Sequence, residues 1–243
     1  MRDIEDYSKK YAVPGFEKYK VFYRKKKLLE VINDFQPQNI LEIGCGSEPL
    51  FLSVPDIRFT VIEPSSDFYN NAVKLSEGDE RITCIEGFFE DVSRRLLPEY
   101  DMIICASLLH EVEDPESFLL AVAKLCNENT IVHIVVPNAN SMHRLLGMEM
   151  GMIADPHQKS QNNKDFQQNN VFDRNSLQQI AERNGLEVTE SGSFFVKPFS
   201  HGQMYEMMEK EILNESVLDG LYHLTKYMPE FGSEIYVNCK LRR

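Results

Sequence analysis

A glycine turn is the part of this sequence whose residue types and spacing most clearly indicate a binding site. The segment ILEIGCGSEPL leads from an apolar strand beginning at Ile40 into Gly44-Cys45-Gly46 and then into a stretch able to start a helix. Glycine adopts positive φ readily and lets a ligand approach the backbone closely. In an open parallel sheet the first such turn lies at the topological switch point, where nucleotide-like ligands bind. A simple tight corner is the alternative role of this turn.

A carboxylate follows the turn at the spacing expected for a nucleoside site. Glu63 stands at the end of the apolar run FTVIEP, roughly twenty residues on, where it could hydrogen-bond two ribose hydroxyls. The dinucleotide pattern GxGxxG is absent because Ser-Glu-Pro follows Gly46, and Glu48 would repel a pyrophosphate. The pattern favours a ligand with a ribose and no phosphates over NAD or FAD. The alternative for Glu63 is an exposed acid at a strand end.

Several basic residues are candidates for contact with a substrate. His143 and Arg144 come together after the predicted fifth strand, where they could bind an anionic group or supply a base, with surface or capping roles as alternatives. His201 follows KPFS and could enter the pocket from the second half of the chain. Arg24 lies in a locally basic helix, either solvated or turned inward to hold a carboxylate. His133, within IVHIVV, is expected in the core.

The chain is also rich in methionine after residue 138. Flexible methionines can line an adaptable pocket, but packing of a helix against the core is the more common role. We favour core packing for Met142, Met148, Met150, Met152, Met204, Met207 and Met208. His157 and His223, in the same half of the chain, have no assigned role.

The elements that must position these residues alternate between strand and helix. Short apolar runs predict strands in NILEIG, FTVIEP, ITCIEG, YDMIICA, TIVHIVVP, EVTESGSFFV and SEIYVNCKL. Helical periodicity marks FEKYKVFYRKKKLLEVINDF, SSDFYNNAVKL, DPESFLLAVAKLC and DRNSLQQIAERNGL, and one or two helices are expected in 204–228. This order predicts βαβ units around a largely parallel sheet. The polar stretch SQNNKDFQQNN is expected to form a surface lid or long loop.

Composition and charge restrict the class of protein. The 243 residues carry a formal net charge of -12, which argues against a nucleic-acid partner. No apolar run approaches the length of a membrane span, and the charged start MRDIEDYSKKY predicts no signal peptide, so a cytoplasmic location is expected. The five cysteines form no CxxC pair, which predicts free thiols and no metal site.

Taken in order, LEIGCG, VIEP, IEGFFEDV and YDMIICASLLHEVEDP resemble the blocks of class I S-adenosylmethionine-dependent methyltransferases over residues 39–137. VPNANSMHRLLG and SGSFFVKPF are similar to small-molecule O-methyltransferases of the ubiquinone-biosynthesis type and of capsule and sugar pathways. The resemblance implies an α/β fold, a Rossmann-like seven-stranded, mostly parallel sheet with helices on both faces and a helical cap. We expect a single domain over 1–243, with an N-terminal helical cap (1–36), a cofactor-binding half (37–137), a substrate and cap region (138–230) and a closing strand (231–243).

The resemblance also assigns roles residue by residue. It implies that the cofactor S-adenosyl-L-methionine, and its product S-adenosyl-L-homocysteine, contact Arg24, Glu42, Gly44, Cys45, Gly46, Glu63, Pro64, Phe88, Phe89, Ala106 and Ser107. Phe88 and Phe89 stand where the family usually offers an Asp, so aromatic packing or backbone groups are expected there. His110, after the fourth strand, faces the methyl-transfer site in these enzymes and could act as general base.

The function implied is methylation of a small-molecule acceptor, most simply O-methylation of a biosynthetic intermediate. His110 and His143 are the candidate catalytic residues, and Arg144 and His201 the candidate substrate-binding residues. A basic pocket inside an acidic chain would suit an anionic acceptor, and no nucleic-acid or membrane partner is expected. A C- or N-methyltransferase, or a non-catalytic partner subunit that retains the fold, are the alternatives. The sequence does not indicate the oligomeric state.

Overall fold

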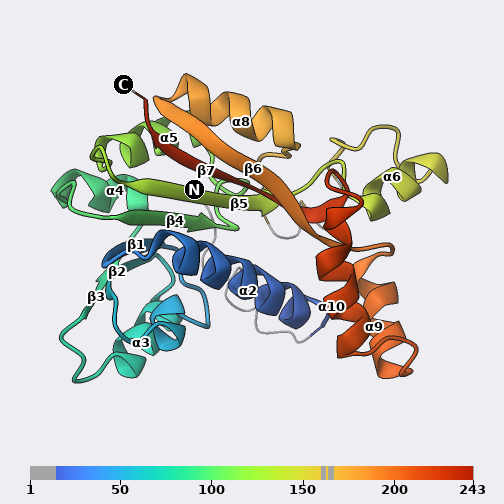
Figure 1. Ribbon diagram of the computed structural model, residues 1–243, viewed down its shortest axis with the longest axis horizontal. Helices are drawn as coiled ribbons and strands as arrows, with labels where there is room; N and C mark the ends of the chain where they lie inside the picture. Colours follow the sequence, from blue (N-terminus) through green and yellow to red (C-terminus); the bar gives the residue numbers. More distant parts are fainter. Residues whose placement is uncertain (1–14, 160–162, 164–166, 243) are drawn as a thin grey trace.

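The computed structural model describes residues 15–159, 163 and 167–242, and these are built around one seven-stranded sheet (Figure 1). Outside the described residues lie 1–14 of the expected N-terminal cap, 160–162 and 164–166 of the polar stretch, and Arg243. The strand order is β3-β2-β1-β4-β5-β7-β6. The strands are β1 (Asn39–Ile43), β2 (Arg58–Glu63), β3 (Ile82–Glu86), β4 (Met102–Ala106), β5 (Ile131–Pro137), β6 (Leu186–Val196) and β7 (Gly232–Leu241).

The first five strands are parallel, and β7 is antiparallel to both of its neighbours. This arrangement confirms the expected mostly parallel sheet. The order reverses between β1 and β4, which creates a switch point at their carboxyl ends. Because β7 runs the opposite way, its first residues also lie at this edge, with Pro137 paired to Glu234. The end of β6 returns to the same edge.

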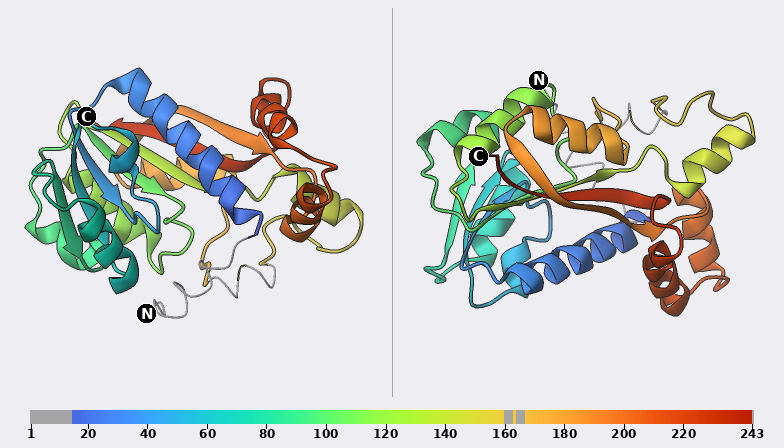
Figure 2. Two further views of the ribbon diagram at one scale, coloured as in Figure 1. Left: turned by 90° about the horizontal axis from the view of Figure 1, so that it is seen from below. Right: turned by 45° about the horizontal axis from the view of Figure 1, so that its top comes forward.

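Helices cover both faces of the sheet, as expected. One face packs against α4 (Phe89–Val92), α5 (Pro115–Lys124) and α8 (Arg174–Arg183), and the opposite face against α2 (Glu17–Phe35) and α3 (Ser66–Leu75). The two views in Figure 2 show α2 crossing its face obliquely, away from α8. Both faces of the central strands are therefore apolar; all five residues of β1 are buried.

A third apolar cluster joins the beginning of α2 to the end of the chain. It contains buried side chains from α2, from β6 and β7, and from α9 (His201–Glu209) and α10 (Glu215–His223). Tyr23 of α2 stacks between Phe195 and Tyr222, with ring centroids 4.7 and 5.3 Å away. Figure 1 shows α9 and α10 at the N-terminal end of α2, so these helices and α6 (Met142–Glu149) form the predicted helical cap. The short 3-10 helices are Leu50–Ser53, Ser93–Arg95 and Leu224–Lys226.

Local sequence signals explain several helix boundaries. Asp114 caps α5, with Pro115 as its first residue, and Asp173 caps α8 in a reciprocal pair with Ser176. Gly185 ends the α8 segment with φ +85°, the left-handed conformation that glycine favours. The stretch 204–228 contains the end of α9 and all of α10, so two helices are present. No helix in the described ranges is both long and apolar enough to cross a membrane.

The methionines divide between core and surface. Met204 is fully buried and Met208 packs against the third apolar cluster, as predicted. Met150 and Met152 are 65% and 72% exposed, so core packing was wrong for these two. They follow the end of α6, beyond the last turn that faces the protein, and no layer lies over them. His133 is completely buried and its Nδ1 lies 2.6 Å from Asn238 Oδ1, which confirms the predicted core histidine.

Gly232 gives a test of the close β6–β7 pairing. A Cβ at this position would lie 2.6 Å from both the backbone nitrogen and oxygen of Phe194, so one strand must shift. We expect Gly232→Ala to lower the free energy of unfolding by about 1–3 kcal/mol, measured by urea denaturation. The control is Gly220→Ala in α10, where nothing lies within 4 Å of the added Cβ. That change should be neutral or stabilise by about 0.5–1 kcal/mol. Equal stability of the two variants would contradict the described pairing.

Candidate active site

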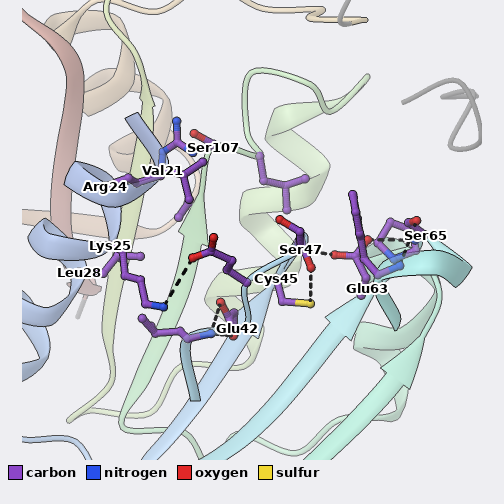
Figure 3. A pocket seen from close by; sticks show the side chains of 18 of the residues that line it. Val21, Arg24, Lys25, Leu28, Glu42, Cys45, Ser47, Glu63, Ser65 and Ser107 are labelled. Carbon is purple, nitrogen blue, oxygen red and sulfur yellow. Dashed lines mark hydrogen bonds and ion pairs between the residues drawn. The ribbon is translucent and has the colours of Figure 1, made fainter. Parts of the chain in front are cut away.

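A cavity opens at the carboxyl ends of β1, β2 and β4, under the middle of α2. It holds about 1070 Å³ of space that protein atoms do not fill, part of it open to solvent. Figure 3 shows Val21, Arg24 and Lys25 of α2 on one side and Glu63 and Ser65 on the other. The position is the switch point of the sheet, where ligands of doubly wound folds bind.

The glycine turn forms the floor of this cavity. Gly44 has φ +80° and Gly46 has φ +57°, so both positions need the left-handed backbone that glycine tolerates. Gly44 N–H donates to the carbonyl of Ile62 at 2.8 Å, which ties the turn to the end of β2. Gly46 N–H donates to Glu63 Oε2 at 3.1 Å. The turn and the carboxylate that the sequence singled out are therefore in direct contact.

Glu63 is held in one orientation. Its Oε1 accepts a hydrogen bond from Ser65 N–H at 2.9 Å, and its Oε2 the bond from Gly46. Cys45 also donates to this carboxylate, so the glycine turn itself helps to fix its orientation. Burial raises the pKa of Glu63, and the bonds from Ser65 and Gly46 oppose this shift. A carboxylate aligned in this way suits a diol such as that of ribose.

Glu42 is a second buried carboxyl on the cavity wall. Both of its oxygens lie within 3.3 Å of Leu50 N–H. Burial, with the nearby charge of Glu63, raises the pKa of Glu42 to about 8, although the bond from Leu50 opposes the shift. Glu48 and Glu111 also line the cavity, where Arg24 and Lys25 are the lining cations. Acidic groups outnumber basic ones here, which favours a cationic ligand and disfavours a pyrophosphate.

Arg24 turns inward, as one of the two expected alternatives, and it holds a carboxylate of the protein itself. Its Nη2 lies 2.6 Å from Glu234 Oε1 and its Nε lies 2.9 Å from Glu234 Oε2. Burial would raise the pKa of Glu234, but the charges of Arg24 and Lys20 lower it to about 2. Arg24 also lines the cavity, so it is placed to meet a bound carboxylate while it stays anchored to β7.

The end of β4 completes the cavity. Ala106 and Ser107 line it, and Ser107 has φ +56°, an uncommon conformation for a residue with a side chain. Its N–H donates to Val135 O at 2.8 Å, which holds the backbone in place. Its buried Oγ has no hydrogen-bond partner among the described residues. Local strain and an unsatisfied hydroxyl at one residue are typical of binding sites.

The expected cofactor residues line this cavity with two exceptions. Arg24, Glu42, Gly44, Cys45, Gly46, Glu63, Pro64, Ala106 and Ser107 do so. Phe88 and Phe89 do not, and Phe89 instead packs in the core, its ring centroid 4.9 Å from that of Phe118. The short helix α4 turns this ring toward α5, away from the cavity. Aromatic packing by Phe68 of α3 is available on the cavity wall in its place.

His110 lies beside the cavity and faces a smaller one. Its side chain is buried, and it lines a pocket shared with Asn138, Arg144 and Asn170. Burial, with the charges of Arg24 and Lys20, lowers the pKa of His110 to about 3. Its Nδ1 has no hydrogen-bond partner in the described part of the chain. A neutral imidazole of this kind accepts a hydrogen bond from a hydroxyl but is a weak proton acceptor.

His143 and Arg144 are neighbours in the sequence, but their side chains have different contacts. Arg144 donates to the carbonyls of Pro156 and Gln158 at 2.8 and 2.6 Å, so it secures the loop after α6. His143 has a buried Nδ1 without a partner in the described ranges, and burial with the nearby charges of Lys197 and His201 lowers its pKa. His143 and His201 therefore face the same region, while Arg144 holds backbone.

Some residues that shape this region escaped the sequence analysis. The cavity is also lined by Val21, Lys25, Leu28, Ser47, Leu50, Ser65, Phe68, Leu108 and Glu111. Four residues around Arg24 also form buried or half-buried polar contacts: Glu17, Lys20, Lys197 and Glu234. The helical spacing of Glu17, Lys20 and Arg24 at i, i+3 and i+7 was the available signal for one polar face.

Comparison with known families and structures gives a consistent picture. Residues 16–191 match the family model described as a methyltransferase domain. A comparison with curated proteins gave no significant match. Among solved structures, the chain is similar to the plantazolicin methyltransferase BamL, crystallised with a triazolic desmethylPZN analog and SAH. The identity is 15%, the TM-score is 0.61, and the match covers 94% of this chain and 88% of that one.

Two further structures have the same fold. The N-methyltransferase NodS from Bradyrhizobium japonicum WM9, in complex with S-adenosyl-l-homocysteine, is 14% identical with a TM-score of 0.56, over 94% of this chain and 88% of that one. The O-methyltransferase NcsB1 from neocarzinostatin biosynthesis, in complex with S-adenosylmethionine and 2-hydroxy-5-methyl naphthoic acid, is 13% identical with a TM-score of 0.51. That match covers 85% of this chain and 50% of that one.

The raised pKa of Glu42 predicts a pH-dependent change in stability. The folded chain holds this proton up to about pH 8, whereas the unfolded chain loses it near pH 4.3. Between these values wild-type stability falls as pH rises, by at most about 1.4 kcal/mol per unit for this group. Glu42→Gln removes the effect, so its stability relative to wild type should increase from about pH 5 to about pH 8 in urea denaturation. Glu48→Gln, on the exposed rim, is the control and should show no such trend. A pH-independent difference for Glu42→Gln would contradict the assignment.

Proposed function

Because the chain belongs to the methyltransferase domain family and is an S-adenosylmethionine-dependent methyltransferase, we propose that it methylates an oxygen atom of a small-molecule acceptor. The observation that carries the proposal is the cavity at the switch point, where the glycine turn meets Glu63. S-Adenosylmethionine supplies an electrophilic methyl group on a positively charged sulfur. The residues of this cavity fit such a molecule in several respects.

The methyl donor carries different groups at its two ends, and different residues line the two ends of the cavity. At the β2 end, the oriented carboxylate of Glu63 suits the ribose hydroxyls, and Pro64 and Phe68 offer apolar surface for the base. At the β4 end, Arg24 is positioned to bind the amino-acid carboxylate and Ser107 Oγ to accept or donate a hydrogen bond. Glu111 gives the middle of the cavity an acidic side chain that favours a sulfonium, and Glu42, protonated below about pH 8, adds a neutral polar group there.

The acceptor is proposed to lie beyond Ser107, toward the helical cap. His110 and His143 have neutral imidazoles with unpaired Nδ1 atoms, which suits hydrogen bonding to a hydroxyl. Lys20, Arg24 and Lys197 make this side of the site basic, which suits an acceptor that carries or develops negative charge on oxygen. The complexes of BamL and NcsB1 with small organic molecules are consistent with an acceptor of modest size. The net charge of -12 argues against a nucleic acid.

Binding of S-adenosylhomocysteine tests the donor site. Isothermal titration calorimetry should detect binding to the wild-type protein, and Glu63→Ala should weaken it by about tenfold or more because two hydroxyl contacts are lost. The matched control is Glu86→Ala, since Glu86 ends β3 as Glu63 ends β2 but is exposed and accepts from Ser66 Oγ. Undetectable binding by the wild-type protein, or equal affinities of the two variants, would overturn the donor site.

The nature of the acceptor atom can be read from the product. After incubation of the protein with S-adenosylmethionine and a metabolite extract, mass spectrometry should reveal a compound that gains one methyl group. Fragmentation should place that group on oxygen. His110→Ala should lower the single-turnover rate on the identified acceptor by reducing the number of hydrogen bonds to the hydroxyl. A methyl group on nitrogen or carbon would replace O-methylation by one of the alternatives, and an unchanged rate would remove His110 from the acceptor site.

A further inference from the structure

A buried charge cluster extends from the cavity toward the helical cap, and the donor site does not use most of it. We define the cluster as Glu17, Lys20, Arg24, Lys197, His201 and Glu234. Its members form a continuous series of contacts. Glu234 Oε1 lies 2.9 Å from Lys20 Nζ and 2.6 Å from Arg24 Nη2. Glu17 Oε1 lies 3.4 Å from Arg24 Nη2.

The remaining contacts reach Lys197. Glu17 Oε2 lies 3.2 Å from His201 Nε2, and His201 Nδ1 lies 2.9 Å from Lys197 Nζ. A carboxylate can only accept and a lysine nitrogen donates here, so the neutral imidazole carries its proton on Nε2. Burial, with the charge of Lys197, lowers the pKa of His201 to about 4, although the bond to Glu17 opposes the shift. The series is therefore oriented, from Lys197 through His201 to Glu17.

The cluster lies next to the methyl-transfer end of the cavity. Arg24 belongs to both, and Glu17 stands seven residues before it on the same helix face, about 10 Å along the axis. Glu234 is the third residue of β7 and Lys197 follows β6, so both lie at the sheet edge that carries the cavity. Figure 1 shows α9, which contains His201, beside the N-terminal end of α2.

Lys197 differs from the other cations of the cluster. It is 1% exposed, and no carboxylate of the described residues lies within ion-pair distance of its Nζ. The groups that act on it come from four elements: Lys20 and Glu17 on α2, Glu234 on β7, Arg144 on α6 and His201 on α9. Burial, followed by the charge of Lys20, lowers the pKa of Lys197 well below the usual lysine value. A desolvated lysine of this kind becomes a neutral amine with a free lone pair, which is a general base.

Unsatisfied polar atoms mark where a ligand would meet this amine. Ser107 Oγ and His110 Nδ1 after β4, His143 Nδ1 after β5, and Ser233 Oγ at the start of β7 are buried without hydrogen-bond partners among the described residues. Each such atom costs about 1–3 kcal/mol unless a ligand or water satisfies it. The charges of Lys197 and His201 act on His143, and Lys197 follows Val196, which pairs with Gly232 beside Ser233.

We propose that Lys197 is the catalytic base that removes the proton from an acidic hydroxyl of the acceptor, a phenol or enol, and that His201 and Glu17 are its positioning residues. This inference rests on the proposed O-methyltransferase function. The acceptor O–H bond breaks and an Nζ–H bond forms, which leaves an anionic oxygen beside an ammonium group. Burial favours the neutral amine, so its lone pair is available to the hydroxyl, and the ammonium that forms is stabilised by the anionic oxygen beside it.

The same residues hold the amine in place. Lys197 donates to Nδ1 of His201, whose Nε2 contacts Glu17, so the position of Nζ is fixed by His201 and, through it, by Glu17. The side chain of Glu17 is 34% exposed, so this end of the series reaches solvent. An aromatic ring contacts the positioning residue: Phe16 meets His201 edge to face at 6.0 Å.

A chromogenic phenol tests the proposal directly. 4-Nitrophenol absorbs visible light only as its anion, and at mildly acidic pH the free compound is mostly un-ionised. Bound to the wild-type protein with S-adenosylhomocysteine, it should show the phenolate spectrum, because Lys197 takes its proton. Calorimetry in buffers of different ionisation enthalpy should then find no net proton release.

Four variants separate the base from its surroundings. Lys197→Met should reduce the bound phenolate about tenfold or more, because the proton acceptor is gone. Lys197→Arg keeps a cation that cannot be deprotonated, so any phenolate should form with release of one proton to the buffer. Glu17→Gln should move the titration of the bound phenol to higher pH. The control Lys210→Met, at the exposed C-terminal end of α9, should behave as wild type.

The outcomes are distinct. A wild-type complex that binds S-adenosylhomocysteine but not the phenolate, or a phenolate signal that survives Lys197→Met, would overturn the role of Lys197 and leave the donor site intact. Failure of S-adenosylhomocysteine to bind would overturn the proposed function instead. Unchanged affinity of each variant for S-adenosylhomocysteine shows that it is folded. If Lys197→Met does not fold, Lys197→Arg and Glu17→Gln decide, and wild-type behaviour of both contradicts the proposal.

Discussion

The site depends on the ion pairs that the buried carboxylate of Glu234 forms with Lys20 and Arg24. Glu234 is 1% exposed, and an uncompensated charge at that depth would cost several kcal/mol. Lys20 and Arg24 compensate it, and both lie on one face of α2. The helix is therefore fixed across the sheet at the point where β7 begins, with Leu28 and Ile32 packed below it. Since α2 also forms one wall of the cavity, these ion pairs help to fix the position of that wall.

The same interaction divides the site into two regions of opposite character. On the proposed donor side, Glu42 and Glu63 are buried carboxyl groups whose pKa values are raised. Burial disfavours their ionised forms, which a bound cation would stabilise. On the cap side, Lys20 and Arg24 are paired with Glu234, and the pKa of the buried Lys197 is lowered. In the proposed reaction a methyl group passes from a sulfonium to an oxygen anion, so reactants of opposite charge meet. Polar groups already arranged in each region favour such a step.

Local sequence patterns were sufficient to predict the parallel half of the sheet and the glycine turn that forms the floor of the cavity. The glycine turn and Glu63 meet at the cavity, and both stand at a strand end, which periodicity places well. Phe89 does not line the cavity, because an aromatic residue after a strand suits either a ligand or the core, and it packs against Phe118. Neighbours on a helix point about 100° apart, so His143 and Arg144 have different contacts: Arg144 holds the loop after α6 and lines the pocket beside His110.

The contacts beyond the sequence analysis join residues far apart in the chain. Arg24 and Glu234 are separated by 210 positions, and Glu17 and His201 by 184, so no local pattern relates them. Their meeting depends on the register of the antiparallel strand. Pro137 pairs with Glu234, and Val196 pairs with Gly232, where the backbone of Phe194 leaves no room for a side chain. A slip of one residue would turn Glu234 to the opposite face of the sheet. The charge cluster would then lose Glu234. The close packing of Gly232 against β6, which fixes this register, is therefore also needed for the cluster on α2.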